Sequence, residues 1–145
     1  MSLPDTNAII RAYLVTRPLL TATIGGGANP RIYCPRLPKA TALPAISFFT
    51  RGGRNDPYIP DLSRISVQFD CWAEYSATEN GALVARNVYR KLYDELQGLQ
   101  DTTIAIGATT YYIKSAIEEV SGQDLVDDTL PNYFRTLTFF EFMIR

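Results

Sequence analysis

The sequence of 145 residues contains no histidine at all. No Ser-His or Cys-His pair can therefore activate a nucleophile. No imidazole can bind zinc, and the commonest general base near neutral pH is missing. An enzyme made from this chain would need carboxylates, lysine or tyrosine for its acid–base chemistry.

Cysteine is scarce, and net charge is nearly absent. Cys34 precedes Pro35 in a predicted connection, and Cys71 lies on the apolar face of a predicted strand. A disulfide between the two cysteines remains an alternative, but two buried or idle thiols in a reducing compartment fit better.

Fourteen basic and 15 acidic residues give a net charge of −1. This balance argues against a dedicated nucleic-acid surface and against a polybasic membrane anchor, which both need clustered Lys and Arg.

Long apolar runs are also missing. None approaches the roughly 20 residues that span a bilayer. The first ten residues, MSLPDTNAII, lack the basic start and long apolar stretch of a secretory signal. These features predict a protein that is made and kept in the cytoplasm.

The chain is long enough for one domain with a substantial core. It has no repeat, no low-complexity tract and no linker, so we predict a single domain over residues 1–145. The predicted elements run helix, strands, helix and then three strands. This order predicts an α+β fold, a largely antiparallel (mixed) sheet of four to five strands with two helices packed on one face.

Two helices are predicted. The first runs from about Asn7 to Thr16, with Asp5 or Thr6 as its cap, and residues 18–24 form at most a short turn. The second follows Ser76, whose spacing to Glu79 is that of a capping box, and ends near Gly98. Its apolar stripe consists of Ala85, Val88, Leu92 and Leu96.

The clearest strand is RISVQFDCWAEYS at 64–76. Its apolar residues alternate with Ser66, Gln68, Asp70, Trp72 and Glu74. A short extended piece is predicted at 31–34. Further strands are predicted at 42–51 and 135–145, with a hairpin over 102–120 that turns near Gly107. Segments 52–61 and 121–132 are rich in turn-forming residues and are predicted to be loops.

Three short features resemble chemical sites. GGGAN at 25–29 could form a phosphate nest, but it lacks P-loop and dinucleotide spacing, so a plain turn is favoured. Glu118 and Glu119 are adjacent, and on a strand they would point to opposite faces. The acidic residues of 121–132 could hold Ca²⁺, but they lack EF-hand spacing, so a solvated acidic loop is favoured.

The predicted sheet is apolar on both faces. Pairs of aromatic residues occur at 48–49, 111–112 and 139–140. Each pair sends one ring to the helix-covered face and one to the opposite face. Because monomers rarely expose such a patch, we expect other subunits to cover it. The alternative is that the sheet curls on itself or that segments 51–62 and 121–132 fold across it. Trp72 marks either a contact surface or a ring that lies across the sheet edge.

The order of these segments carries a resemblance. RIY at 31–33 is followed by LPAISFF at 43–49, a Gly/Arg-rich loop and RISVQFDCWAEYS at 64–76. That strand leads straight into ATENGALVARNVYRKLYDEL, and the chain ends in RTLTFFEFMIR. From about Asn7 to its end, the sequence resembles the tail completion, or tail terminator, proteins of long-tailed bacteriophages.

The resemblance implies a virion protein, assembled in the host cytoplasm, that forms a six-membered ring of identical copies. The ring would bind the tail tube protein and the head–tail connector protein. DNA would pass through its lumen without specific binding, and no membrane, cofactor, metal or enzyme activity is implied. The interface candidates are Arg51, Arg54, Asp56, Tyr58, Trp72, Asp124, Asp127, Asp128, Phe140 and Phe142.

Two other functions are compatible with the sequence. The chain could be another ring protein of the head–tail connector or neck. It could also be a small enzyme or ligand-binding domain that uses carboxylates and tyrosines, with a pocket lined by Tyr111, Tyr112 and Tyr133.

Overall fold

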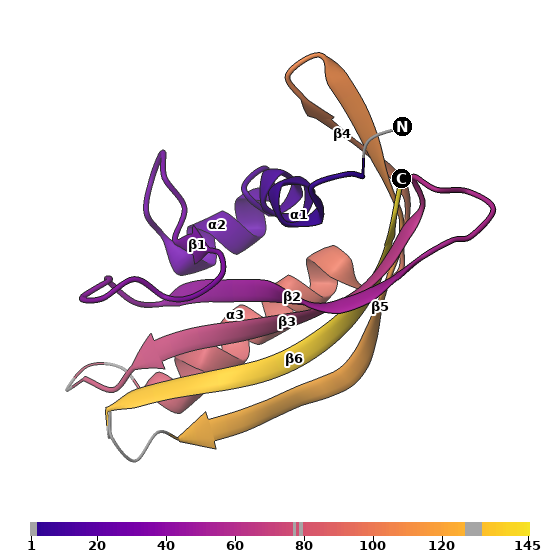
Figure 1. Cartoon of the computed structure of the whole chain (residues 1–145). Helices are drawn as coiled ribbons and strands as arrows, with labels where there is room; N and C mark the ends of the chain where they lie inside the picture. Colours follow the sequence, from indigo (N-terminus) through magenta and orange to yellow (C-terminus); the bar gives the residue numbers. More distant parts are fainter. Residues whose placement is uncertain (1–2, 77, 79, 127–131) are drawn as a thin grey trace.

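The computed structural model describes residues 3–76, 78, 80–126 and 132–145. These residues form three helices and one six-stranded sheet (Figure 1). The elements are α1 (Thr6–Leu14), α2 (Pro18–Ile24), β1 (Ile32–Tyr33), β2 (Ala45–Asn55), β3 (Ser63–Glu74), α3 (Gly81–Leu96), β4 (Leu99–Ile106), β5 (Thr109–Val126) and β6 (Tyr133–Ile144).

The sheet has the order β1-β2-β3-β6-β5-β4. The β1–β2 pair is parallel, and every other pair is antiparallel. The predicted α+β class and the largely antiparallel mixed sheet are therefore confirmed. The described residues contain one helix and at least one strand more than predicted.

The additional helix is α2, whose residues were predicted to form at most a short turn. Pro18 occupies its first turn, where a missing N–H is harmless and the fixed φ is already helical. Leu20 and Ile24 are fully buried, so tertiary packing supports this short helix. The cap of α1 is as predicted: the Ala8 N–H donates to the Asp5 carboxylate at 3.2 Å.

The predicted start of α3 is wrong. Asn80, and not Ser76, caps this helix, because its side-chain oxygen accepts the N–H groups of Ala82 and Leu83. The helix begins with Gly81 in close contact with β6, where a Cβ would lie 2.7 Å from the ring of Phe134. The predicted end is correct, since Gly98 has a φ of +82° directly after the cap residue.

One core lies between the helices and one face of the sheet. Figure 1 shows the three helices on the same side of the strands. The four predicted stripe residues of α3 are all buried, as are the alternate β3 residues Ile65, Val67, Phe69, Cys71 and Ala73. This packing confirms the predicted faces of both elements.

Two strands continue beyond their predicted ends. β2 runs on through Asn55, although its Gly52-Gly53 pair resembles a turn, because both glycines pair with β3 after a bulge between Thr50 and Gly52. β5 runs on to Val126 and pairs with β6 through three register shifts. Arg54 and Asp124 therefore belong to strands and not to the loops predicted for them, and Arg51 lies in a strand, as predicted for 42–51.

The two cysteines are free thiols. Cys71 is fully buried, and Cys34 is partly buried. Burial raises the pKa of both thiols above the ordinary value, so both favour the protonated form. Among the helices that the structure describes, none is long and apolar enough to cross a membrane.

Candidate functional site

The face of the sheet opposite the helices has no helix over it among the described residues (Figure 1). We call it the open face. Cross-strand register aligns Phe49, Gln68, Phe139 and Val120 in one row over β2, β3, β6 and β5. Other members on these strands include Arg51, Arg54, Arg64, Ser66, Asp70, Trp72, Arg135, Leu137, Glu141 and Met143.

The predicted alternative, that segment 51–62 folds across this face, is not what the structure shows. Residues 51–55 belong to β2, and the connection 56–62 extends beyond the sheet next to the C-terminus (Figure 1). Tyr58, near the tip of this connection, is 92% exposed. The Asp56 carboxylate is held locally, because it accepts the N–H groups of Tyr58 and Ile59 at 2.8 and 3.0 Å. This connection is therefore an ordered projection from the sheet.

Arginine side chains cover the aromatic rings of the open face. The guanidinium carbon of Arg51 lies 4.3 Å from the centre of the Phe139 ring, and that of Arg135 lies 5.3 Å from the Trp72 ring. Such cation–π contacts stabilise the charge over the ring face by roughly 0.5–1 kcal/mol at exposed sites. Phe139 and Trp72 of the open face therefore lie beneath arginine side chains, and both are partly exposed.

Trp72 and Asp70 connect through a polar network on this face. The Trp72 Nε1–H donates to Ser47 Oγ at 2.9 Å, and Arg135 pairs with Asp70 at 3.3 Å. Burial raises the pKa of Asp70, while hydrogen bonds from Gln68 and Arg135 and the Arg135 charge oppose that rise. Trp72 thus lies on the sheet surface in a fixed orientation, partly exposed beneath Arg135.

Phe140 and Phe142, which were predicted as interface residues, are not on the surface. Both are fully buried in the core on the helix-covered face, and both rings contact Phe69. The prediction is wrong for these two residues, because the even-numbered residues of β6 face the helices. Their odd-numbered neighbours Leu137 and Phe139 carry the apolar surface of the open face.

Of the three aspartates in the acidic segment 121–132, the structure describes Asp124. Asp124 accepts the Thr136 hydroxyl at 3.0 Å and pairs with Arg86 of α3 at 3.5 Å. It therefore joins the strands to the helix and does not meet Arg51 or Arg54. Asp127 and Asp128 lie outside the described residues.

The adjacent glutamates diverge, as the sequence predicted for a strand. Glu118 accepts the hydroxyls of Tyr89 and Thr138 at 2.7 Å on the helix side. Glu119 accepts the Ser66 hydroxyl at 2.6 Å on the open face. They do not form one catalytic pair. Among the described residues, no three Asp, Glu or Cys side chains are grouped to hold a metal ion.

The tyrosines named for a ligand pocket do not meet either. Tyr111 and Tyr112 belong to the β4–β5 hairpin, where Tyr112 exchanges backbone hydrogen bonds with Arg145 at the end of β6. Tyr133 lies at the opposite end of β6, where it lines a hollow of about 400 Å³. That hollow combines Trp72 and Tyr133 with the basic residues Arg36 and Lys39.

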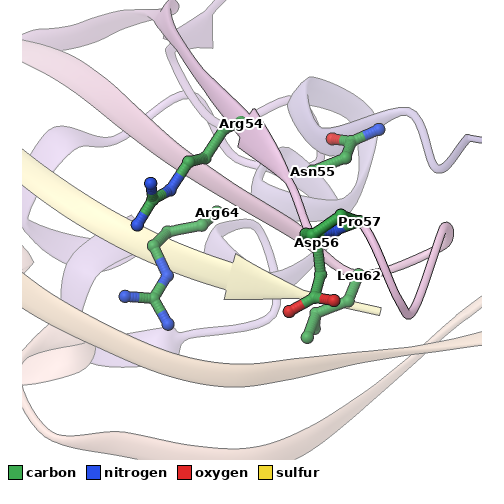
Figure 2. A pocket seen from close by; sticks show the side chains of 6 residues that line it. All are labelled: Arg54, Asn55, Asp56, Pro57, Leu62 and Arg64. Atoms are coloured by element: carbon green, nitrogen blue, oxygen red, sulfur yellow. The ribbon is translucent and has the colours of Figure 1, made fainter.

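A second hollow, of about 230 Å³, lies where the connection between β2 and β3 extends beyond the sheet (Figure 2). Its lining includes Arg54 and Arg64, which are direct cross-strand partners. Sequence reasoning selected Arg54 but missed Arg64. Pairing β2 with β3 around residues 56–62 would have placed the two arginines opposite each other, but segment 52–61 was predicted to be a loop.

No protein family model and no curated protein sequence matches the chain.

Proposed function

We propose that this chain is a structural virion protein that caps a bacteriophage tail tube and joins it to the head connector as a ring of six identical subunits. The mechanism is steric: the ring binds the last tube ring, blocks further addition and presents a new surface. No chemical step is required of the chain.

The open face is the observation that carries this proposal. It spans four strands, bears Phe49, Leu137 and Phe139, and no described helix lies over it. Partly exposed aromatic and aliphatic side chains that cluster on one sheet face, mixed with arginines, are typical of a surface that another protein covers. Subunits of a ring supply that cover for each other.

The two edges of the sheet also support a ring. β4 forms one edge, and at the other edge β1 pairs with β2 over only two residues. The two edges therefore offer different surfaces. A head-to-tail contact between unlike surfaces generates a closed ring when the rotation between subunits closes.

The mass of the protein in solution tests the ring. Light scattering over a concentration series should reveal a species of six 16.2 kDa chains, about 97 kDa. A monomer at every concentration that also fails to assemble on added purified tail tubes would contradict the proposal. Particles that lack the protein should have overlong or unjoined tails, whereas heads that leak DNA would indicate a connector instead.

Substitutions at Arg51 and Arg54 test the function without disturbing the core, because both side chains are exposed on β2. We expect simultaneous reversal of both charges to impair tail joining and to leave the subunit folded. A variant that completes infectious particles at normal yield would show that these residues have no part in joining.

A further inference from the structure

Arg54 and Arg64 form a pair of like charges that the fold itself brings together. They occupy directly opposite positions on the antiparallel strands β2 and β3. Like charges at such positions destabilise a sheet. The bulge between Thr50 and Gly52 produces this register, and Gly53 contacts the backbone of Arg64 and Ile65 so closely that no side chain fits there.

Neither arginine has a close carboxylate within the part of the chain that the structure describes. The nearest partner of Arg64 is Glu141 at 3.9 Å, at the outer limit of an ion pair, and both side chains are nearly half exposed. Arg54 makes no ion pair with a described residue. Two guanidinium groups thus lie next to each other with most of their donors unused.

The pair has space in front of it. Arg54 and Arg64 line the 230 Å³ hollow and also a second hollow of about 310 Å³ on the side of Ser66 and Glu141. Figure 2 shows both guanidinium groups pointing in the same direction, away from the Asp56 carboxylate. A planar oxyanion placed there could accept charge-assisted N–H donors from both guanidinium groups, and such hydrogen bonds are stronger than neutral ones.

The surrounding charges favour a protein carboxylate over nucleic acid. A DNA backbone requires several cations along its path, since each phosphate carries a charge. Here Glu141 and Glu119 lie on the open face beside the pair, with Glu119 bonded to Ser66. A continuous polyanion would meet both acidic groups, whereas a single carboxylate at the arginines would meet mainly Glu141, whose charge is opposed there by two cations.

We propose that the Arg54–Arg64 pair is a binding site for a carboxylate side chain on an acidic segment of a partner protein. The site consists of Arg54 and Arg64 at paired strand positions and does not require the tail-terminator function, in which Arg54 is also a candidate residue. Occupation of the site would relieve the repulsion between the two arginines, so binding and stability should be coupled.

A nuclear magnetic resonance titration of the folded chain tests this site. The probes are a short peptide with adjacent glutamates, the same peptide with glutamines, inorganic phosphate, and a short DNA duplex. We expect the glutamate peptide to shift the side-chain Nε–Hε signals of Arg54 and Arg64, with little effect from the glutamine peptide. R54Q combined with R64Q should weaken this binding about tenfold or more, because charge-assisted hydrogen bonds are lost.

Two further variants serve as controls. Arg90→Gln removes an exposed arginine of α3, on the other side of the sheet, and should leave peptide binding unchanged. Arg54→Lys keeps the charge but not the planar fork, and it should retain only part of the affinity. The proposal is overturned if no probe shifts the pair, if the duplex or phosphate binds it more tightly than the glutamate peptide, or if the double variant binds the peptide normally.

Discussion

At the scale of single residues, Gly52 and Gly53 determine the position of β2 side chains beyond the sheet centre. Both have positive φ, +113° and +152°, a conformation that residues with a Cβ rarely adopt. The two differ in their surroundings: a Cβ on Gly52 meets nothing within 4 Å, whereas one on Gly53 collides with the carbonyl oxygen of Arg64. Gly53 therefore carries a constraint that Gly52 does not.

This difference predicts unequal effects of the same substitution. Gly52→Ala should lower the free energy of unfolding by about 1–3 kcal/mol through backbone strain alone. Gly53→Ala should lower it by more than that, because strain and collision combine. Urea denaturation of both variants measures the difference. If both variants lost the same free energy of unfolding, β2 and β3 would be able to move apart near the bulge at no cost. The pairing of Arg54 with Arg64 would then not be fixed by Gly53.

At the scale of elements, α3 shows how a local signal can be displaced by one turn. The capping-box spacing at Ser76 and Glu79 is a legitimate helix start, but Asn80 is an equally good cap. Gly81 allows the helix to begin against the ring of Phe134, which sequence inspection alone does not reveal. The tertiary contact with β6 decides between the two caps.

Asn80→Ala should lower the free energy of unfolding by about 1 kcal/mol, because two N–H groups of the first turn lose their acceptor. Asn80→Ser is the matched control, since its hydroxyl restores an acceptor at the same position, and we expect it to stay close to the wild type. Thermal or urea unfolding measures both. If the serine variant lost as much stability as the alanine variant, capping would not be the function of this side chain.

The sequence predicted the elements with regular periodicity and missed those that depend on distant contacts. The alternation of β3 and the stripe of α3 were assigned to the correct faces, because burial follows periods of 2 and 3.6 residues. The extensions of β2 and β5 were missed, since glycine and polar residues there pair only through bulges. Assigning Phe140 and Phe142 to the surface was wrong because β6 is apolar on both sides, and pattern alone does not identify the helix side.

At the scale of the whole molecule, the sheet separates two apolar surfaces with different functions. Phe140 is fully buried within the chain, and the adjacent Phe139 lies on the open face beneath Arg51. The first residue stabilises the fold. Under the proposed function, the second lies where subunits meet.

Identical substitutions at these neighbouring positions should separate the two functions. Phe140→Ala should lower the free energy of unfolding by about 3–5 kcal/mol through loss of burial and the cavity left behind. Phe139→Ala should cost much less stability but should shift light-scattering masses toward the monomer. A Phe139→Ala protein with unchanged mass at every concentration, or with a stability loss as large as that of Phe140→Ala, would contradict this division.

The two buried threonines of β6, Thr136 and Thr138, oppose a misfolded state in which this strand pairs one residue out of register. Since Leu137 and Phe139 would fill the core face nearly as well as their neighbours, hydrophobicity alone hardly opposes a one-residue slip of the central part of β6. The Thr138 hydroxyl lies within hydrogen-bond distance of two acceptors, the Glu118 carboxylate and the Val120 carbonyl, and the Thr136 hydroxyl donates to Asp124. A slipped strand would lose these bonds and would turn two charged side chains, Arg135 and Glu141, toward the helices. Polar side chains therefore protect this chain from misfolding at the strand where its apolar residues are least selective.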